Sequence, residues 1–507
     1  MGSTATKPAA LHHWIAGRAD RGSSTRSGPV YDPASGNVIA TLPYASEADV
    51  DRAVRAAARA AEGWAAMAPS GRARVLRRYL ALLADSAEAV AAHITREQGK
   101  ALDEAREELQ CGLEALEAAC GVSPLLEGRF SQGIGSDVDC YSLRQPLGIV
   151  AGVTPFDDPL MVPLWMYPLA LACGNAFLLK PSERVPSAAL LAADLLHAAG
   201  LPPGLLSVVN GDRETVEHLI AHPGIAAISF VGSTPAARGV YARGIAAGKR
   251  VQALGGAKNH AVVLPDADLS AAADCIVAAA YRAAGQRCTA VSVAVAVGEI
   301  ADDFVAALVD RAQRLTVGRG LAPGTDVGPV TTGASRRCLE LAIEAGVREG
   351  AKLVLDGRYD ASERGFFVGP TVLDGVRPGM TVYDDELFGP VLAVVRVDSF
   401  DEALALIDAN PFGNGAALFT RDGGAARAFQ RRVGVGTVAI NVACPTPIAL
   451  HSFGGWKASL FGDLQIHGED GVAFYTRTKV VTARWPARPQ PGRLAADGSS
   501  PAAVLTR

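Results

Sequence analysis

The chain of 507 residues lacks the features of a secreted, a membrane-spanning or a nucleic-acid-binding protein. Its 8 cysteines include no Cys-x-x-Cys pair and no regular spacing, which argues against a disulfide framework or a zinc knuckle. The sequence has no apolar run of about 18 residues and no apolar export segment near its start, so we expect a cytoplasmic protein without a membrane partner. The 48 basic residues do not exceed the 52 acidic ones, and a nucleic-acid partner is therefore not expected.

What the chain does contain is a long series of alternating apolar and helical segments, which starts at residue 148. The apolar segments GIVAGV, NAFLLK, LLSVVNG and AAISFVG are separated by helical segments of about 10 to 15 residues. This alternation is typical of a parallel sheet covered by helices on both faces. A second set of such segments runs from about residue 260 to 440. We therefore expect an α/β protein with two α/β units.

Two segments fit neither of the expected sheets. DVDCYSLRQPLG at 137–148 and GVAFYTRTKVVTARW at 471–485 alternate like exposed strands, and such edges need a partner strand. The residues after Trp485 are rich in Pro, Gly, Ala and Ser, which predicts a flexible tail over 487–507.

The usual dinucleotide signal, a Gly-x-Gly-x-x-Gly turn, is missing from the first α/β unit. In its place SFVGSTPAARG puts Gly232 and Ser233 before a helix whose N-terminus suits an anion such as a pyrophosphate. Upstream, KPSER ends another strand, and the carboxylate of Glu183 there can bond ribose hydroxyls and repel a 2′-phosphate, which favours NAD over NADP. Both patterns also occur in helices and solvated loops that bind no ligand.

The segment YRAAGQRCTAVS is the best candidate for a reactive centre. It places Cys288 next to Arg287, and a nearby cation lowers the pKa of a thiol and raises the fraction of nucleophilic thiolate. Taken alone, a buried structural cysteine is an equally good interpretation.

Several motifs occur in the order and spacing of the aldehyde dehydrogenase superfamily. They are KPSE at 180–183, FVGS at 230–233, GQRC at 285–288, ELFGP at 386–390, and Asn410-Pro411 with Gly413. More narrowly, PLWMYPLALACGN, KPSERVPS, GKRVQALGGAKNH and HSFGGWKASLFGD resemble the CoA-acylating methylmalonate-semialdehyde dehydrogenase branch. The resemblance covers roughly residues 12 to 485.

This resemblance implies an aldehyde dehydrogenase-like fold with three parts. The first is a Rossmann-type NAD-binding domain over 10–130 and 147–255, and the second is an α/β catalytic domain over 256–440. The third is a β oligomerisation arm over 131–146 and 470–486. The two segments that fit neither sheet then pair across subunits of a homo-oligomer, either a dimer or a tetramer.

The resemblance also implies residue roles. Cys288 is then the catalytic nucleophile that adds to a small-molecule aldehyde, and loss of hydride to NAD leaves a thioester on the enzyme. No metal is expected. The residues placed around the cofactor are Thr154, Pro155, Phe156, Lys180, Ser182, Glu183, Arg184, Gly232, Ser233, Leu254, Gly255, Glu386 and Phe388.

Release of the thioester distinguishes the branches of the superfamily. Hydrolytic members carry a glutamate general base where QALGGAK places Leu254, just before Gly255. Leucine cannot activate water. Thiolysis by coenzyme A as co-substrate is the better interpretation, as in the semialdehyde branch.

The stretch GVTPFDDP departs from the family pattern, which has an asparagine oxyanion donor where this chain has Asp157. An ionised aspartate only accepts hydrogen bonds, and loss of one oxyanion donor costs on the order of 10²–10³ in rate. An apolar site can instead keep an aspartate protonated, so that the carboxyl donates a hydrogen bond, as happens in ketosteroid isomerase. Asp158 next to it can share the proton or point away.

A second departure concerns the substrate. Semialdehyde dehydrogenases usually carry, at the place of Cys111, an arginine that binds the substrate carboxylate together with the residue matching Arg287. We therefore expect Arg287, Cys111 and Asp158 to contact substrate, and we hypothesise that malonate or methylmalonate semialdehyde is not preferred. A less anionic or an amine-bearing aldehyde fits better.

Two other functions stay open at this point. The first is a repurposed dehydrogenase that acts on an unusual aldehyde or imine in a specialised pathway, because Asp157 changes the electrostatics of the central step. The second is an inactive NAD-binding homologue with a role in assembly.

Overall fold

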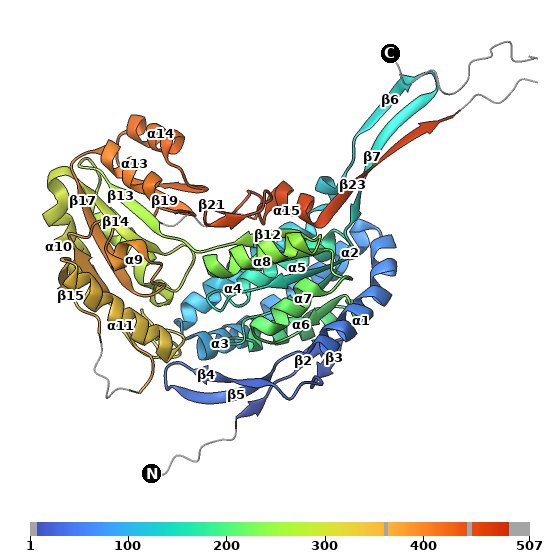
Figure 1. The fold of residues 1–507 in the computed structure, drawn as a ribbon, viewed down its shortest axis with the longest axis horizontal. Helices are drawn as coiled ribbons and strands as arrows, with labels where there is room; N and C mark the ends of the chain where they lie inside the picture. Colours follow the sequence, from blue (N-terminus) through green and yellow to red (C-terminus); the bar gives the residue numbers. More distant parts are fainter. Residues whose placement is uncertain (1–7, 359–363, 444–448, 486–507) are drawn as a thin grey trace, which may run out of the picture.

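The computed structural model describes residues 8–358, 364–443 and 449–485, and these build two large sheets, each with its own hydrophobic core (Figure 1). The tail expected at 487–507 lies outside the described residues. Within the described part of the chain, no helix combines the length and the apolar character needed to cross a bilayer.

The first large sheet has 8 strands in the order β22-β12-β11-β8-β9-β10-β2-β3. The strands from β12 to β10 run parallel to one another, and antiparallel strands complete both sides of the sheet. Their bounds are β2 (His13–Ile15), β3 (Arg18–Asp20), β8 (Ile149–Val153), β9 (Ala176–Lys180), β10 (Leu206–Val208), β11 (Ala227–Val231), β12 (Arg250–Leu254) and β22 (Leu460–Phe461). The parallel sheet expected from residue 148 onward is thus present.

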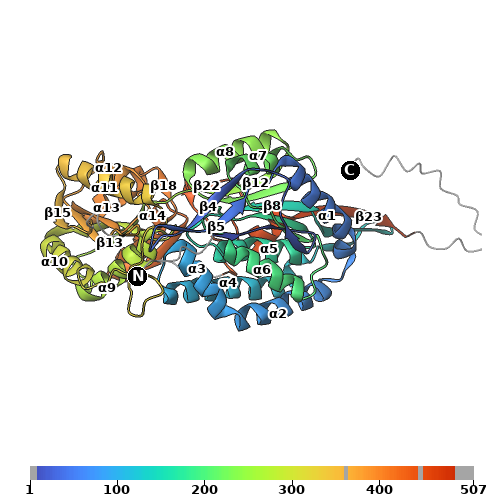
Figure 2. The same ribbon diagram turned by 90° about the horizontal axis from the view of Figure 1, so that it is seen from below.

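Helices cover both faces of this sheet, as Figure 2 shows. On one face lie α1 (Glu47–Ala66), α7 (Arg213–Ala221) and α8 (Thr234–Ala246). On the other lie α5 (Met161–Ala172) and α6 (Ser187–Ala198), with an outer layer of α2 (Pro69–Asp85), α3 (Ala87–Gln98) and α4 (Leu102–Cys120). This outer layer matters for the site, because the turn between α3 and α4 reaches the end of β8.

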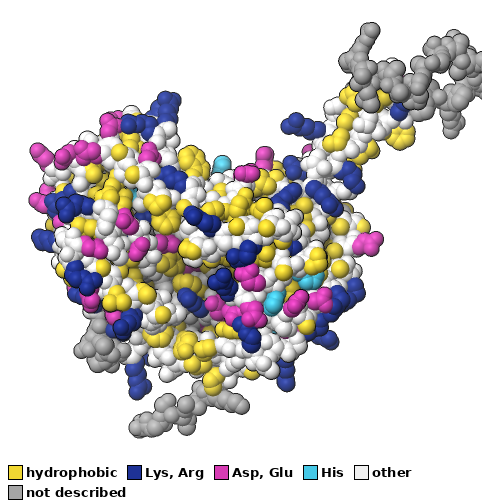
Figure 3. All heavy atoms as spheres, viewed as in Figure 1, with side chains coloured by type: hydrophobic (Ala, Val, Ile, Leu, Met, Phe, Trp, Pro, Cys, Tyr) yellow, Lys and Arg dark blue, Asp and Glu magenta, His cyan; other side chains and the backbone are white. Residues whose placement is uncertain are grey.

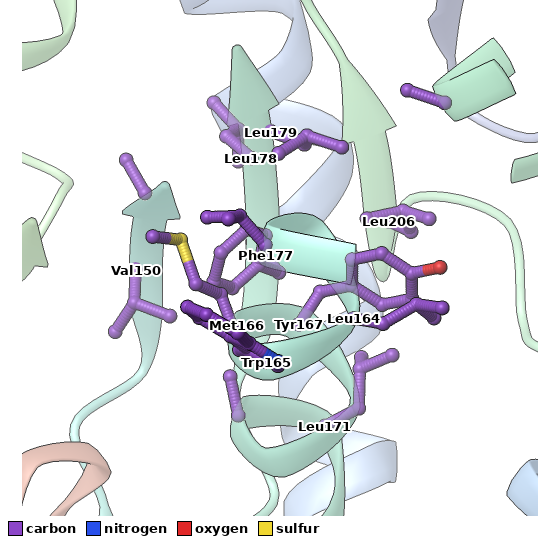
Figure 4. Close-up of a cluster of buried hydrophobic side chains, with 14 of the residues drawn as sticks. Val150, Leu164, Trp165, Met166, Tyr167, Leu171, Phe177, Leu178, Leu179 and Leu206 are labelled. Atoms are coloured by element: carbon purple, nitrogen blue, oxygen red, sulfur yellow. The ribbon is translucent and has the colours of Figure 1, made fainter. Parts of the chain in front are cut away.

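Buried apolar side chains fix α5 against β8 and β9 (Figure 4). Met166 and Tyr167 of α5 are fully buried next to Val150 and Phe177 on the two strands. A Cβ at Gly152 would lie 2.4 Å from the Phe177 ring, so only glycine fits there. The position of β8 is therefore fixed by packing, and this in turn fixes where the residues that follow it, 154–158, begin.

The second large sheet has 7 strands in the order β15-β16-β17-β14-β13-β19-β20, all parallel except β15. They are β13 (Asn259–Val263), β14 (Val291–Val297), β15 (Lys352–Leu355), β16 (Thr371–Asp374), β17 (Val391–Val397), β19 (Gly415–Phe419) and β20 (Thr437–Ile440). Helices α9 (Leu269–Tyr281) and α10 (Ala301–Ala312) lie on one face. Around the rest of the sheet lie α11 (Gly333–Arg348), α12 (Thr381–Asp384), α13 (Phe400–Ala409) and α14 (Gly423–Arg432).

A third sheet projects from the body of the molecule (Figure 1). It joins β6 (Phe130–Gly135), β7 (Val138–Pro146) and β23 (Thr476–Arg484), and β7 and β23 are paired along their whole length. Apolar atoms lie on its surface (Figure 3). Phe130 and Val480 of this sheet are 64% and 66% exposed. The strand expected over 471–485 is wrong for its first residues, because 471–475 form the end of α15 (Gly468–Tyr475) and pack into the first core.

Two small sheets complete the described structure. One contains β1 (Ala9–Ala10), β4 (Ser27–Asp32) and β5 (Asn37–Pro43), and the other pairs β18 (Phe412–Gly413) with β21 (Trp456–Lys457).

Candidate active site

Cys288 lies in the connection between α9 and β14, and the backbone before it is strained. Ala283, Ala284 and Gly285 have φ values of 51°, 52° and 68°, a region that residues with a Cβ rarely enter. A Cβ at Gly285 would lie 2.2 Å from the carbonyl oxygen of Gly389, so this position requires glycine. Backbone strain of this kind persists only where the surrounding structure imposes it, and it is common at functional sites.

Two asparagine amides hold the backbone of Cys288 in place. Asn259 and Asn414 each donate from Nδ2 to the Cys288 carbonyl oxygen at 2.9 Å. Asn259 also donates to Ala290 O at 3.0 Å, and its Oδ1 accepts the N–H of Gly415 at 3.1 Å. The sequence analysis gave no role to either asparagine. The only signal was that Asn259 lies inside the quoted motif GKRVQALGGAKNH.

Two cavities meet at Cys288. A cleft of about 850 Å³ is lined by Cys288 together with Asp157 and the ends of the first sheet's strands. A smaller cavity of about 350 Å³ is lined by Cys288 together with Asp158, Arg287 and Cys111. Cavities of this size accommodate small-molecule ligands. The candidate nucleophile therefore has room for one ligand on each side.

The residues expected around the cofactor come together in the larger cleft, with one exception. Leu254, at the end of β12, is buried and is not part of the lining, whereas its neighbours Gly255 and Gly256 are. Ser233 is the N-cap residue of α8, but its side chain forms no capping hydrogen bond. The lining residues that were expected are Thr154, Pro155, Phe156, Lys180, Ser182, Glu183, Arg184, Gly232, Ser233, Gly255, Glu386 and Phe388.

An ion pair lies at the end of β9, on the wall of this cleft. Lys180 Nζ is 3.1 Å from Glu183 Oε2. Burial raises the pKa of the Glu183 carboxyl, but Lys180 and the Glu183 backbone N–H more than offset this, and the net pKa is lowered. Glu183 is thus an ionised carboxylate that can accept hydrogen bonds from a diol.

Near Cys288, the wall of the cleft is formed by Glu386 and two aromatic rings. Glu386 Oε1 accepts the N–H of Ala257 at 2.7 Å, and a Cβ at Gly256 would lie 2.1 Å from Glu386 Oε2. Burial raises the pKa of Glu386. Phe388, at φ 53°, meets the ring of Phe156 edge to face at 5.7 Å. These contacts fix a carboxyl and an aromatic face at the inner end of the cleft.

Asp157 is close to the candidate nucleophile. One carboxylate oxygen of Asp157, one of Asp158 and the sulfur of Cys288 all lie within 4.8 Å of one another. Asp157 is 3% exposed, and its Oδ1 has no hydrogen-bond partner among the residues that the structure describes. Burial first, and then the neighbouring Asp158, raises the pKa of Asp157 to about 8.

A buried lysine, which the sequence analysis missed, organises this acidic group. Lys100 Nζ donates to Glu108 Oε2 at 2.8 Å, to the Asp157 carbonyl oxygen at 2.6 Å and to Asp158 Oδ1 at 3.1 Å. Glu108 Oε1 accepts the backbone N–H groups of Leu160 and 161 at 2.9 and 3.1 Å. Three donors as close as the two aspartates and Cys288 can hold a cation, but the Lys100 ammonium already supplies the positive charge there. This arrangement disfavours a metal ion.

Of the cations that line the smaller cavity, Arg287 is the one without an ion pair among the residues that the structure describes. Arg282 pairs with Glu104 and Glu107, and Lys100 pairs as described above. Arg287 donates from Nη2 to Ala279 O at 3.1 Å, and its Nε is buried without a hydrogen-bond partner among the described residues. Cys111, also on this wall, is a neutral thiol, because burial and nearby carboxylates raise its pKa to about 11.

Comparison with known proteins identifies the class. The family model of the aldehyde dehydrogenase family matches residues 20–481. The chain therefore belongs to the aldehyde dehydrogenase family and is an enzyme.

Individual relatives narrow the comparison to one branch of this family. The chain is 51% identical over 484 residues to the malonate-semialdehyde dehydrogenase of Pseudomonas aeruginosa. This match covers 94% of this chain and 97% of the relative. A structure from Sinorhizobium meliloti 1021, assigned as a methylmalonate-semialdehyde dehydrogenase in complex with NAD, is 46% identical with a TM-score of 0.94 and covers 96% and 99% of the two chains. The methylmalonate-semialdehyde dehydrogenase structure from Oceanimonas doudoroffii is 48% identical with a TM-score of 0.93 and covers 95% and 99%.

Proposed function

We propose that the protein oxidises an aldehyde with NAD through a thioester on Cys288 and passes the acyl group to coenzyme A. One observation carries the proposal: Cys288 lines both cavities, so its thiol stands where a dinucleotide on one side and an aldehyde on the other would meet. Membership of the aldehyde dehydrogenase family supports the reaction, and the NAD in the Sinorhizobium relative supports the cofactor.

The larger cleft suits NAD. It contains the buried hydroxyl of Thr154, which has no hydrogen-bond partner in the described part of the chain, and the carboxylate of Glu183 for the ribose diol. It also contains glycine backbone at Gly255 and Gly256 that a ligand can approach closely. Bound there, NAD supplies a hydride acceptor. We assign the nicotinamide end of the cofactor to Glu386 and Phe388, which line the same cleft as Cys288.

The residues described above account for the steps on the enzyme side. The Cys288 thiolate attacks the aldehyde carbon, a C–S bond forms, and the carbonyl electron pair moves to the oxygen. Asn259 and Asn414 hold the Cys288 backbone while this charge develops. When hydride leaves the carbon for the cofactor, the C=O bond re-forms and an acyl thioester remains on Cys288.

Leu254 supports release of this thioester by coenzyme A. The hydrocarbon side chain is buried at the end of β12, where hydrolytic relatives are expected to carry a glutamate base. A thiol of ordinary pKa, about 8.5, needs less help than water to attack a thioester.

The substrate proposal follows from the charges of the smaller cavity. Arg287 is the cation left to bind a carboxylate, whereas Asp158 and the neutral Cys111 face the same space. This composition supports an aldehyde that is less anionic than malonate semialdehyde, or one that bears an amine.

We also propose the organisation outlined by the sequence. The NAD-binding domain comprises 10–130 and 147–255, the catalytic domain comprises 256–440, and the projecting sheet is an oligomerisation arm in a dimer or tetramer. A cytoplasmic location belongs to the same proposal.

Mass spectrometry and NADH absorbance test the central step. With NAD and an aldehyde but no coenzyme A, we expect about one NADH per active site and an acyl mass on the peptide that contains Cys288. Added coenzyme A should start continuous turnover. Cys288→Ala should abolish both signals, and Cys140→Ala, on the projecting sheet, should change neither.

Three results would contradict the proposal. Continuous turnover at the same rate without coenzyme A means hydrolytic release. Activity on imines alone supports the repurposed dehydrogenase. NAD binding without turnover of any aldehyde or imine supports the inactive homologue.

A further inference from the structure

Among the described residues, Asp157 is the carboxyl of this buried cluster that forms no ion pair with Lys100, whereas Glu108 and Asp158 each form one. A lysine ammonium has three N–H donors. All three on Lys100 are used, on Glu108, on Asp158 and on the carbonyl oxygen of Asp157, so none remains for the Asp157 carboxyl. Asp157 Oδ1 is buried and unpartnered.

Of the groups around Asp157, Asp158 and Glu108 raise its pKa and the Lys100 ammonium lowers it, but burial is the largest influence and the net effect favours the uncharged form. Its own loop supplies Asp158, the α3–α4 region supplies Lys100 and Glu108, and the connection before β14 supplies Cys288. One ammonium therefore serves three carboxyl groups. An isolated ionised carboxylate is costly to bury, and the usual outcome is that the group binds a proton.

A protonated Asp157 carboxyl can act as a hydrogen-bond donor next to Cys288. It lies beside the sulfur of Cys288, on the wall of the cofactor cleft, where the family pattern has an amide donor. A carboxylic acid has one O–H donor. Asp157 can thus supply the hydrogen bond that the asparagine would have supplied.

We propose that Asp157 is a catalytic residue that stays protonated and donates its O–H to the oxyanion formed when Cys288 adds to the aldehyde. This proposal rests on the proposed function. The proton stays on Asp157 throughout: the hydrogen bond strengthens as the C–S bond forms and the oxygen becomes negative, and it weakens when hydride leaves and the C=O bond re-forms. No further reactant is consumed.

The proposal predicts an alkaline loss of activity that asparagine would not show. The folded-state pKa of Asp157 is raised to about 8, so the donor is present below that pH and is lost as the pH rises through it. An ionised Asp157 would oppose the oxyanion. An ordinary cysteine nucleophile behaves in the opposite way, because its thiolate fraction grows with pH.

Two substitutions separate a donor from a merely structural group. Asp157→Asn keeps a donor and removes the titration, so its kcat should stay within about tenfold of the native value at pH 7 and should not fall above pH 8. Asp157→Ala removes the donor, and its kcat should fall by about 10²–10³ at neutral pH with little change in the KM for NAD. An Asp157→Ala loss of only a few-fold, or the same alkaline loss in Asp157→Asn as in the native enzyme, would overturn the proposal.

Infrared spectroscopy tests the protonation without turnover. The difference spectrum of native protein minus Asp157→Asn should contain the C=O stretch of a protonated carboxylic acid at pH 7, and this band should disappear as the pH rises through about 8. The same pair of spectra in a Cys288→Ala background should keep the band. If no aldehyde is oxidised but the band is present, the proposed function has failed while the protonation stands. Absence of the band at pH 7 overturns the inference, whatever the activity.

Discussion

Replacing Lys100 with methionine should strongly destabilise the protein. The lysine side chain is 2% exposed and contacts Glu108 and Asp158, whose side chains are 2% and 7% exposed. Methionine keeps the length and the apolar stem, but it removes the ammonium and all three of its hydrogen bonds. Two carboxyl groups then remain buried without a counter-charge. Breaking a buried ion pair from one side costs about 3–5 kcal/mol, and we expect a loss of that size in the apparent free energy of unfolding.

The loss should depend on pH, and its sign follows from the carboxyl groups. Burial raises the pKa of Glu108 in the folded state even with Lys100 present. Without the ammonium this pKa rises further, so the folded protein takes up protons at a higher pH than the unfolded chain does. A carboxyl whose folded-state pKa is raised destabilises the fold fully above that pKa; the destabilisation shrinks as the pH falls below it and is gone only below the unfolded-state pKa. The deficit of Lys100→Met should therefore be largest at alkaline pH and should shrink as the pH falls.

Urea unfolding followed by tryptophan fluorescence measures this effect. Trp165 lines the same cavity as Lys100 and reports on its surroundings. The matched control is Lys352→Met, at an exposed lysine on the edge strand β15, where a change within about 0.5 kcal/mol is expected. A deficit for Lys100→Met of less than about 1 kcal/mol at pH 8, or one that stays constant down to pH 5, would refute the reasoning.

Two further predictions concern the ligands. Glu183→Gln removes the charge that opposes a 2′-phosphate and releases Lys180 from its ion pair. The preference for NAD over NADP, measured as the ratio of kcat/KM values, should therefore fall by about tenfold or more. An unchanged ratio means that Glu183 does not contact the adenosine ribose. Neutral and amine-bearing aldehydes should give higher kcat/KM values than malonate semialdehyde in the presence of NAD and coenzyme A, because Arg287 is the one cation of the described cavity lining that is not in an ion pair. Efficient use of malonate semialdehyde would contradict this prediction.

Contiguous motifs made much of the site predictable. The alternation of apolar and helical segments predicted the parallel first sheet, and the family motifs at its strand ends predicted part of the lining of the larger cleft. Asp157 and Cys288 could be paired because each lies in a short motif of a recognisable family. Strand-like alternation misled at 471–475, where burial against the first core favours a helix instead.

The supporting residues could not be predicted, because long-range packing selects them. Lys100 lies 57 positions before the carbonyl oxygen that it contacts, in a turn between two helices that carries no motif. Asn414 lies 126 positions from Cys288. Nothing in the local sequence distinguishes these side chains from solvated ones, since their partners are brought to them only by the packing of whole sheets and helices.

The two reacting groups of the site come from different cores. Asp157 follows β8 in the first sheet, and Cys288 precedes β14 in the second. Their separation is therefore set by how the two sheets dock, and a small rigid-body rotation of one against the other would change it without altering any bond angle within either. A ligand that spans both cavities therefore contacts both cores and bears on how closely the Asp157 carboxyl and the Cys288 sulfur approach each other.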